Sequence, residues 1–327
     1  MYWIKTIVSA AVGFLIAIGV AISIEKCGGA IGGIIGSVPT TIVPTSYIFL
    51  TESGLSRLEQ AESLFAAPIG ILATNLIFLP IWKVFPARLE KWMNNTRVTF
   101  VTLVVSIIAW FIAAVFVSWL EEVTARIGMK IWTFSIIVML ICAVVGFMLC
   151  WSLAPTPKGN HKVKWYTHLL RGLTAALCIC VTSWLSSSGL GLFAGAFSGF
   201  PAIFSTSIVS VSLAQGASVS TGAVGPMIIG GCAGGWYALL CGALHVFTTW
   251  NAFICIVFTH VVVVVCWNVP IYFFVKWRRD VTALKKKKEI PVVVVQEKHE
   301  KHELHEEKHE EKHEEHADNE IDRKSVV

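Results

Sequence analysis

Two stretches of the sequence place prolines among clustered hydroxyl side chains inside apolar segments, at 27–50 and 190–213. A proline lacks an amide hydrogen and disrupts the preceding helical turn, so backbone carbonyls lose their partners. Within a bilayer these carbonyls need hydroxyls, water or a bound solute. We therefore expect a transport path here, with the candidates Gly33, Ser37, Pro39, Thr40, Thr41, Thr45, Glu52, Gly195, Ser198, Pro201, Ser205, Thr206 and His260. The alternative is that small residues simply allow close helix contact, as in Gly191-x-x-x-Gly195.

Few ionisable side chains lie inside the apolar segments, and each of these is a functional hypothesis. His260 lies ten residues into the span 251–275, where an imidazole could relay protons or bind a ligand. A histidine bonded to a neighbouring carbonyl is the alternative. Glu52 follows the first proline-containing span and could gate the path or attract a cation, although carboxylates at helix ends are usually only solvated. Asn75 and His245 are weaker candidates of the same kind.

A histidine-rich tail follows the apolar part of the chain. Its six regularly spaced histidines are His299, His302, His305, His309, His313 and His316. In a helix they would line one face, where neighbouring imidazoles could share a Zn, Ni or Cu ion. Low-complexity expansion produces the same spacing, so a solvated tail is the alternative. No other cofactor is expected.

The same tail carries two features typical of interaction segments. Lys285 to Lys288 follow the last apolar span and could hold the anionic cytoplasmic leaflet. The terminal Ser325-Val326-Val327 fits the pattern that PDZ domains bind by strand addition. We therefore consider a cytoplasmic protein partner for this tail.

Composition indicates that these groups belong to an integral membrane protein whose first partner is the lipid bilayer. Of 327 residues, 55% are hydrophobic and 14% charged, and mean hydropathy is +0.69. No Asp, Glu, Lys or Arg occurs between Arg171 and Lys276. We predict an all-α polytopic fold with about nine transmembrane helices, at 5–24, 27–50, 62–84, 98–120, 131–153, 165–187, 190–213, 220–247 and 251–275. The overall charge of +5 gives little reason to expect nucleic-acid binding.

The distribution of basic residues predicts the orientation of the chain. Nine crossings place the clusters at 83–97, 158–164 and 276–288 on one side of the membrane. By the positive-inside rule this side is cytoplasmic, so the C-terminus is cytoplasmic and the N-terminus is outside or lumenal. Eight tryptophans near span ends, Trp82 among them, predict an interfacial aromatic belt.

The two proline-containing spans also resemble each other. Displacing the chain by 162 residues aligns Gly29, Gly33 and Pro39 with Gly191, Gly195 and Pro201. Five crossings separate the starts of the two units, so the units would be inverted, as in many secondary transporters. A duplicated bundle that transports nothing is the alternative. We expect a first repeat unit with a connecting helix at 1–154, a second unit at 155–280 and the charged tail at 281–327.

The stretch from Gly33 to Thr40, followed by Tyr47-Ile48, Glu52-Ser-Gly54 and Leu58, resembles the central motif of the GlpM-type family of small bacterial membrane proteins. The likeness covers about 26 residues, and Gly195 to Pro201 is similar to a diverged second copy. This resemblance implies a multi-pass membrane protein and no defined reaction.

The sequence lacks the nucleophile-elbow, phosphate-loop and HExxH motifs, so we expect no enzyme. The leading hypothesis is a secondary transporter or channel for a small solute or ion, with its path between the spans 27–50 and 190–213. The alternative is a non-catalytic scaffold or assembly factor that recruits partners through its C-terminal tail.

Overall fold

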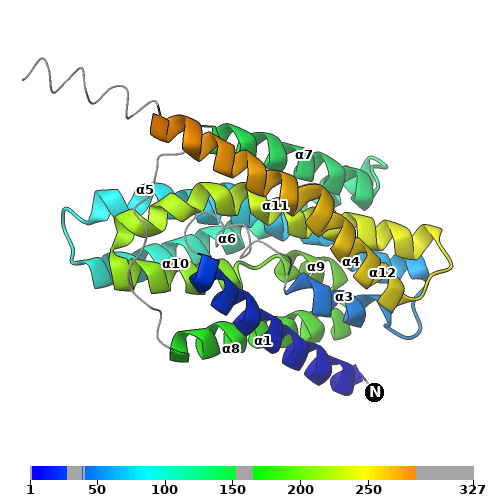
Figure 1. The fold of residues 1–327 in the computed structure, drawn as a ribbon. Coiled ribbons are helices and arrows are strands. Elements are labelled where there is room, and N and C mark those ends of the chain that lie inside the picture. Colours follow the sequence, from blue (N-terminus) through cyan, green and yellow to red (C-terminus); the bar gives the residue numbers. More distant parts are fainter. Residues whose placement is uncertain (1, 28–38, 40, 152–164, 285–327) are drawn as a thin grey trace, which may run out of the picture. The chain divides into compact units, whose positions relative to one another are not determined.

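A computed structural model describes residues 2–27, 39, 41–151 and 165–284, which form helices and turns without a strand among them (Figure 1). In chain order the helices are α1 (Tyr2–Cys27), α3 (Ile42–Leu50), α4 (Arg57–Ala73), α5 (Leu79–Leu89), α6 (Asn95–Arg126), α7 (Ile131–Cys150), α8 (Trp165–Ser187), α9 (Gly191–Ser198), α10 (Ala202–Gln215), α11 (Ala217–Phe247) and α12 (Ala252–Val263). The π-helical segments η1 (Thr74–Phe78) and η2 (Val264–Asn268) continue α4 and α12, and helix resumes over 269–284. The chain divides into two units between Arg279 and Asp280, and the contacts below lie in the first.

Within the described residues, eight helical stretches are long and apolar enough to cross a bilayer. They correspond to eight of the nine predicted spans. The ninth, 27–50, is described only at Pro39 and from Thr41 onward, where α3 begins. An all-helical fold with several membrane-length apolar helices is thus confirmed, whereas the number nine and the three-part division of the chain stay predictions.

The span 190–213 is interrupted where the sequence suggested a break. α9 ends at Ser198, and α10 begins at Ala202 after Gly199, Phe200 and Pro201. The missing amide of Pro201 explains why a single helix does not run through this point. α3 likewise begins three residues after Pro39. Pro44 lies in the first turn of α3, where a proline is tolerated because its amide would have no helical partner.

The helices pack in antiparallel pairs that join distant parts of the sequence. Near the start of α1, the hydroxyl of Thr6 lies 2.5 Å from that of Ser183, while Ala17 meets Ala175 further along. The residue numbers of contacting residues therefore increase along α1 and decrease along α8, so the two helices are antiparallel. α4 and α11 show the same relation, because Gln60 bonds His245 at 2.8 Å whereas Asn75 lies 3.5 Å from Cys232.

Contacts between turns define two opposite ends of this helix bundle. At the N-terminal end, Lys5 donates to the Thr51 carbonyl at 2.7 Å and Arg57 donates to the Trp250 carbonyl at 2.8 Å. At the other end, Asn95 donates to the Ser212 carbonyl at 2.8 Å. α3 ends at the first and α10 at the second. The two helices therefore run in opposite directions from the middle of the bundle, as Figure 1 shows.

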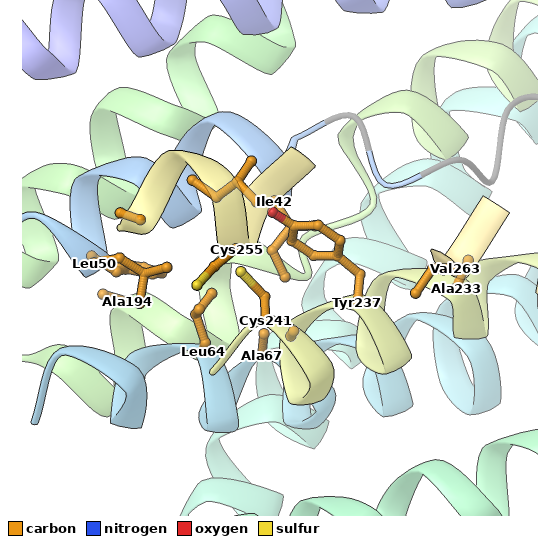
Figure 2. Close-up of a cluster of buried hydrophobic side chains, with 14 residues drawn as sticks. Ile42, Leu50, Leu64, Ala67, Ala194, Ala233, Tyr237, Cys241, Cys255 and Val263 are labelled. Carbon is orange, nitrogen blue, oxygen red and sulfur yellow. The ribbon is translucent and has the colours of Figure 1, made fainter. Parts of the chain in front are cut away.

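Buried side chains of α3, α4, α9, α11 and α12 join the interrupted helices to the rest of the bundle (Figure 2). Ile42, Leu64, Ala194 and Tyr237 belong to this cluster. On the outside, α6 presents a row of exposed apolar side chains suited to lipid contact, formed by Phe111, Ile112, Val115, Phe116 and Trp119. Trp82 was wrongly assigned to the interfacial belt: it is fully buried, and its indole donates to Ser106 at 3.1 Å.

Candidate functional site: a cavity between two interrupted helices

A cavity of about 70 Å³ lies between the start of α3 and the break that separates α9 from α10. One wall comes from the start of α3, a second from the break between α9 and α10, and a third from α4, η1 and α11. The lining residues are Pro39, Thr41, Ile42, Ile71, Thr74, Asn75, Ser198, Gly199, Phe200, Pro201, Ala202, Ile203, Phe204, Gly231 and Gly234. Because one water needs about 10–15 Å³ by a comparable measure, the space suits a few waters or one small solute.

Asn75 is the most buried polar side chain of this cavity, with no exposed surface. Its amide nitrogen lies 3.5 Å from the sulfur of Cys232, a weak acceptor, and its oxygen has no partner among the described residues. Unsatisfied buried polar atoms are costly. The residue sits in η1, and π-helical turns interrupt α-helices frequently at functional sites. The free oxygen therefore marks a place for a ligand or water.

A chain of hydrogen bonds fixes the break between α9 and α10 against α4. The Thr74 hydroxyl donates to the Gly199 carbonyl at 2.8 Å. The buried indole of Trp110 donates in turn to the Thr74 hydroxyl at 2.9 Å and to the Gly70 carbonyl at 3.1 Å. Its ring meets that of Phe200 edge-to-face at 5.0 Å. The non-helical segment is thus held in one conformation by side chains from α4 and α6.

The hydroxyls predicted to serve the freed carbonyls bond carbonyls of their own helix. Thr45 donates to the Thr41 carbonyl at 2.8 Å, and Ser198 donates to the Gly195 carbonyl at 2.6 Å. Ser205 donates to the Pro201 carbonyl, and Thr206 donates to the Ala202 carbonyl at 3.0 Å. These bonds satisfy acceptors around both breaks. They also show that hydroxyl clustering by itself does not place free hydroxyls in a path.

Glycines bring α9 against α4. A Cβ added at Gly195 would lie 2.7 Å from the Cβ of Ala66 and closer still to the Ser63 carbonyl oxygen. At Gly199 an added Cβ would lie 2.7 Å from the Ile71 amide nitrogen. The close-contact interpretation of Gly191-x-x-x-Gly195 therefore describes Gly195 correctly, and we call this α4–α9 contact the glycine seam.

The structure brings four of the predicted path residues, Pro39, Thr41, Ser198 and Pro201, to the cavity lining. Thr45, Gly195, Ser205 and Thr206 lie near it in the helices that form its walls. Glu52 lies at the N-terminal end and accepts a hydrogen bond from Ser186 at 2.9 Å. His260 does not line the cavity: its ring packs edge-on against that of Tyr237, with centroids 6.4 Å apart.

Several predicted residues lie outside the described residues. They are Gly33, Ser37 and Thr40 of the first proline-containing span and the tail histidines His299, His302, His305, His309, His313 and His316. Among the described residues, no group of three His, Cys, Asp or Glu side chains could hold a metal ion. The cysteines whose side chains the structure describes are unpaired, namely Cys142, Cys150, Cys178, Cys180, Cys232, Cys241, Cys255 and Cys266.

Sequence reasoning undervalued the third wall. Asn75 ranked only as a weak candidate, and Thr74, Gly231 and Gly234 were not considered. The available signal was a Thr-Asn pair inside an otherwise apolar run seven residues after Pro68. Such a pair is usually buried against a partner.

Comparison of the chain with family models, curated proteins and solved structures finds no match. The resemblance to the GlpM-type family thus stays a prediction, and the chain's own geometry must indicate its class.

Proposed function

We propose that this protein is a secondary transporter or channel whose solute passes through the cavity between the two interrupted helices. The observation that carries the proposal is the convergence of Pro39 and Thr41 with Ser198 and Pro201 on one small, partly polar space. Irregular backbone at membrane depth is tolerated where it lines such a cavity. A packed scaffold would have no need of a cavity with an unsatisfied amide in its wall.

The helix boundaries support the inverted repeat that this mechanism uses. Displaced by 162 residues, α1 would span 164–189, and α8 spans Trp165–Ser187. The continuous helix Arg57–Leu89 would span 219–251, close to α11 at Ala217–Phe247. The corresponding helices also pair in antiparallel fashion across the bundle, α1 with α8 and α4 with α11. Such pairing is expected of two units related by an axis in the membrane plane.

The charges at the two ends support the predicted orientation. The end opposite the N-terminus collects basic residues with few acids, namely Lys83, Arg88, Lys91, Arg97, Lys276, Arg278 and Arg279. The N-terminal end mixes Lys5, Arg57, Arg126 and Lys130 with several glutamates, among them Glu52 and Glu121. The positive-inside rule then makes the C-terminal end cytoplasmic.

Flux through liposomes containing the purified full chain tests the proposal. In Gly231→Ala the added Cβ would lie 2.6 Å from the Asn75 oxygen, so the cavity must narrow. Gly19→Ala is the matched control, because its Cβ would meet nothing within 4 Å. We expect flux to fall in the first variant only. Equal flux in both variants and the wild type would contradict a path through this cavity.

The scaffold alternative makes a different prediction for the tail. If the protein acts by recruiting partners, removing residues 285–327 abolishes its function. If it transports, the shortened chain retains basal flux in the same liposomes, because every residue of the described cavity is still present.

A further inference from the structure

We infer that the cavity binds a small anion; this inference rests on the proposed function and names the class of its solute. The reason lies in the backbone atoms that two helices present to the cavity. α3 and α10 both begin at its wall and run away from it toward opposite ends of the bundle. The cavity therefore faces two helix N-termini.

A helix N-terminus carries a partial positive charge equivalent to about half an elementary charge, because its first amides have no helical acceptors. In α10 the amides of Ile203 and Phe204 donate to no backbone carbonyl among the described residues. They point back along the helix axis toward the break, and both residues line the cavity. Free amides at a helix start are a common binding site for anions.

The carbonyls at the same break are mostly occupied, so the end of α9 does not balance these donors. The amides of Gly199 and Phe200 donate to the Ala196 carbonyl at 3.1 Å and the Phe197 carbonyl at 2.9 Å. The Gly199 carbonyl is bonded to Thr74, and the Pro201 carbonyl accepts from the Ser205 amide and hydroxyl. Among the carbonyls of 195–202, that of Ser198 is the exception. The amides of Ile203 and Phe204 are thus free donors at the break, beside the free Ser198 carbonyl.

Asn75 gives the second, independent indication of a ligand, since its fully buried amide has an unpartnered oxygen at the cavity wall. In the described orientation of the amide, this oxygen can accept a hydrogen bond from an anion that carries a hydroxyl, such as hydrogencarbonate. A half-turn of the amide exchanges its two ends. The amide nitrogen then faces the cavity and can donate to any of these anions. In the described orientation the side chain serves only an anion that carries a hydroxyl.

The side chains around the cavity include no competing charge. None of the lining residues that the structure describes is acidic or basic. A cation would meet two positive helix ends without a carboxylate to offset them, whereas an anion would need no basic side chain. A weakly held anion is also what passage requires, because a site with a fixed positive side chain would release it slowly.

The test introduces a negative charge at the start of α3 without disturbing the helix. Thr41 is the N-cap residue of α3 and lines the cavity. Asp and Asn are both favoured at this position, so Thr41→Asp and Thr41→Asn differ mainly in charge. Ala202→Asp and Ala202→Asn form a second pair at the first turn of α10, for use if either Thr41 variant fails to fold.

Flux of chloride, nitrate, formate and hydrogencarbonate is measured in liposomes with the full chain, alongside sodium, potassium and glycerol. We expect the wild type to carry at least one of the four anions. Each Asp variant should carry it at a rate at least about tenfold below its Asn counterpart, because a unit charge a few ångströms away in a partly buried site repels the anion strongly.

Three results would overturn the inference. They are equal anion flux in the Asp and Asn variants, absence of flux for all four anions, and flux of sodium, potassium or glycerol alone. If only sodium, potassium or glycerol passes and Gly231→Ala reduces its flux, the proposed path through the cavity still holds and only the inference that the solute is an anion is refuted. No flux of any probe would count against both.

Discussion

The glycine seam permits a prediction in which two glycines of one short helix respond differently to the same change. In Gly195→Ala the new Cβ would lie 2.7 Å from the Cβ of Ala66 and would also meet the Ser63 carbonyl. Ordinary contacts begin near 3.4 Å, and the Ser63 carbonyl oxygen would lie only 2.0 Å from the new Cβ, so α9 must move from α4 by about 1.4 Å. In Gly191→Ala the new Cβ would lie 3.1 Å from the Ser63 hydroxyl alone, and this hydroxyl can rotate away.

Overpacking of this kind costs about 1–3 kcal/mol where backbone must move, and less where a side-chain rotor can adjust. We therefore expect Gly195→Ala to lower the melting temperature of the detergent-purified protein by several degrees, and Gly191→Ala to change it little. Because α9 ends in the cavity wall at Ser198, the same displacement should reduce flux in Gly195→Ala.

Thermal unfolding, monitored by size-exclusion chromatography, measures the change in melting temperature. Liposome flux measures the change in transport. Equal melting temperatures for the two variants would refute the seam as the determinant of α9 position. A destabilised Gly195→Ala protein with unchanged flux would refute the coupling between the seam and the cavity while leaving the packing argument in place.

Three further predictions concern the cavity wall and the tail. Trp110→Phe removes the indole N–H that donates to Gly70 and Thr74. A hydrogen bond in a membrane protein contributes about 0.6 kcal/mol, and leaving buried acceptors unpaired adds a further cost, so thermal unfolding should show a loss of stability of about 1–2 kcal/mol. An unchanged unfolding midpoint would show that these bonds do not stabilise the fold. Asn75→Asp should reduce anion flux at least about tenfold at neutral pH, with recovery once acid protonates the new carboxylate; pH-independent flux would contradict a charge effect. Calorimetry should detect zinc binding to the full chain and none after residues 285–327 are removed. A wild-type affinity no better than millimolar would refute the metal hypothesis.

Much of the fold could be predicted because membrane-length apolar runs are separated by charges. α8 ends at Ser187, where its predicted span 165–187 ends, because Ser188 follows the apolar run. The helix that contains the last predicted span, 251–275, continues to 284 beyond Lys276. Charges mark where hydrocarbon ends and do not mark where a helix ends.

The site was only half predictable. Pro39 and Pro201 lie just before helix starts, as their local patterns suggested, whereas Pro68 and Pro226 lie inside continuous helices. The third wall depends on which helix crosses the interruption, and no local pattern encodes that choice for Asn75 or Gly231. His260 illustrates the opposite error, because a central position in an apolar run does not say whether a side chain faces a cavity or, as here, a neighbouring aromatic ring.

The seam between α4 and α9 has a mechanical consequence. With backbone in direct contact at Gly195 and Gly199, and Thr74 bonded across the join, α4 and α9 can only travel as one rigid piece. If access alternates between the two sides of the membrane, we therefore expect α4 and α9 to move together.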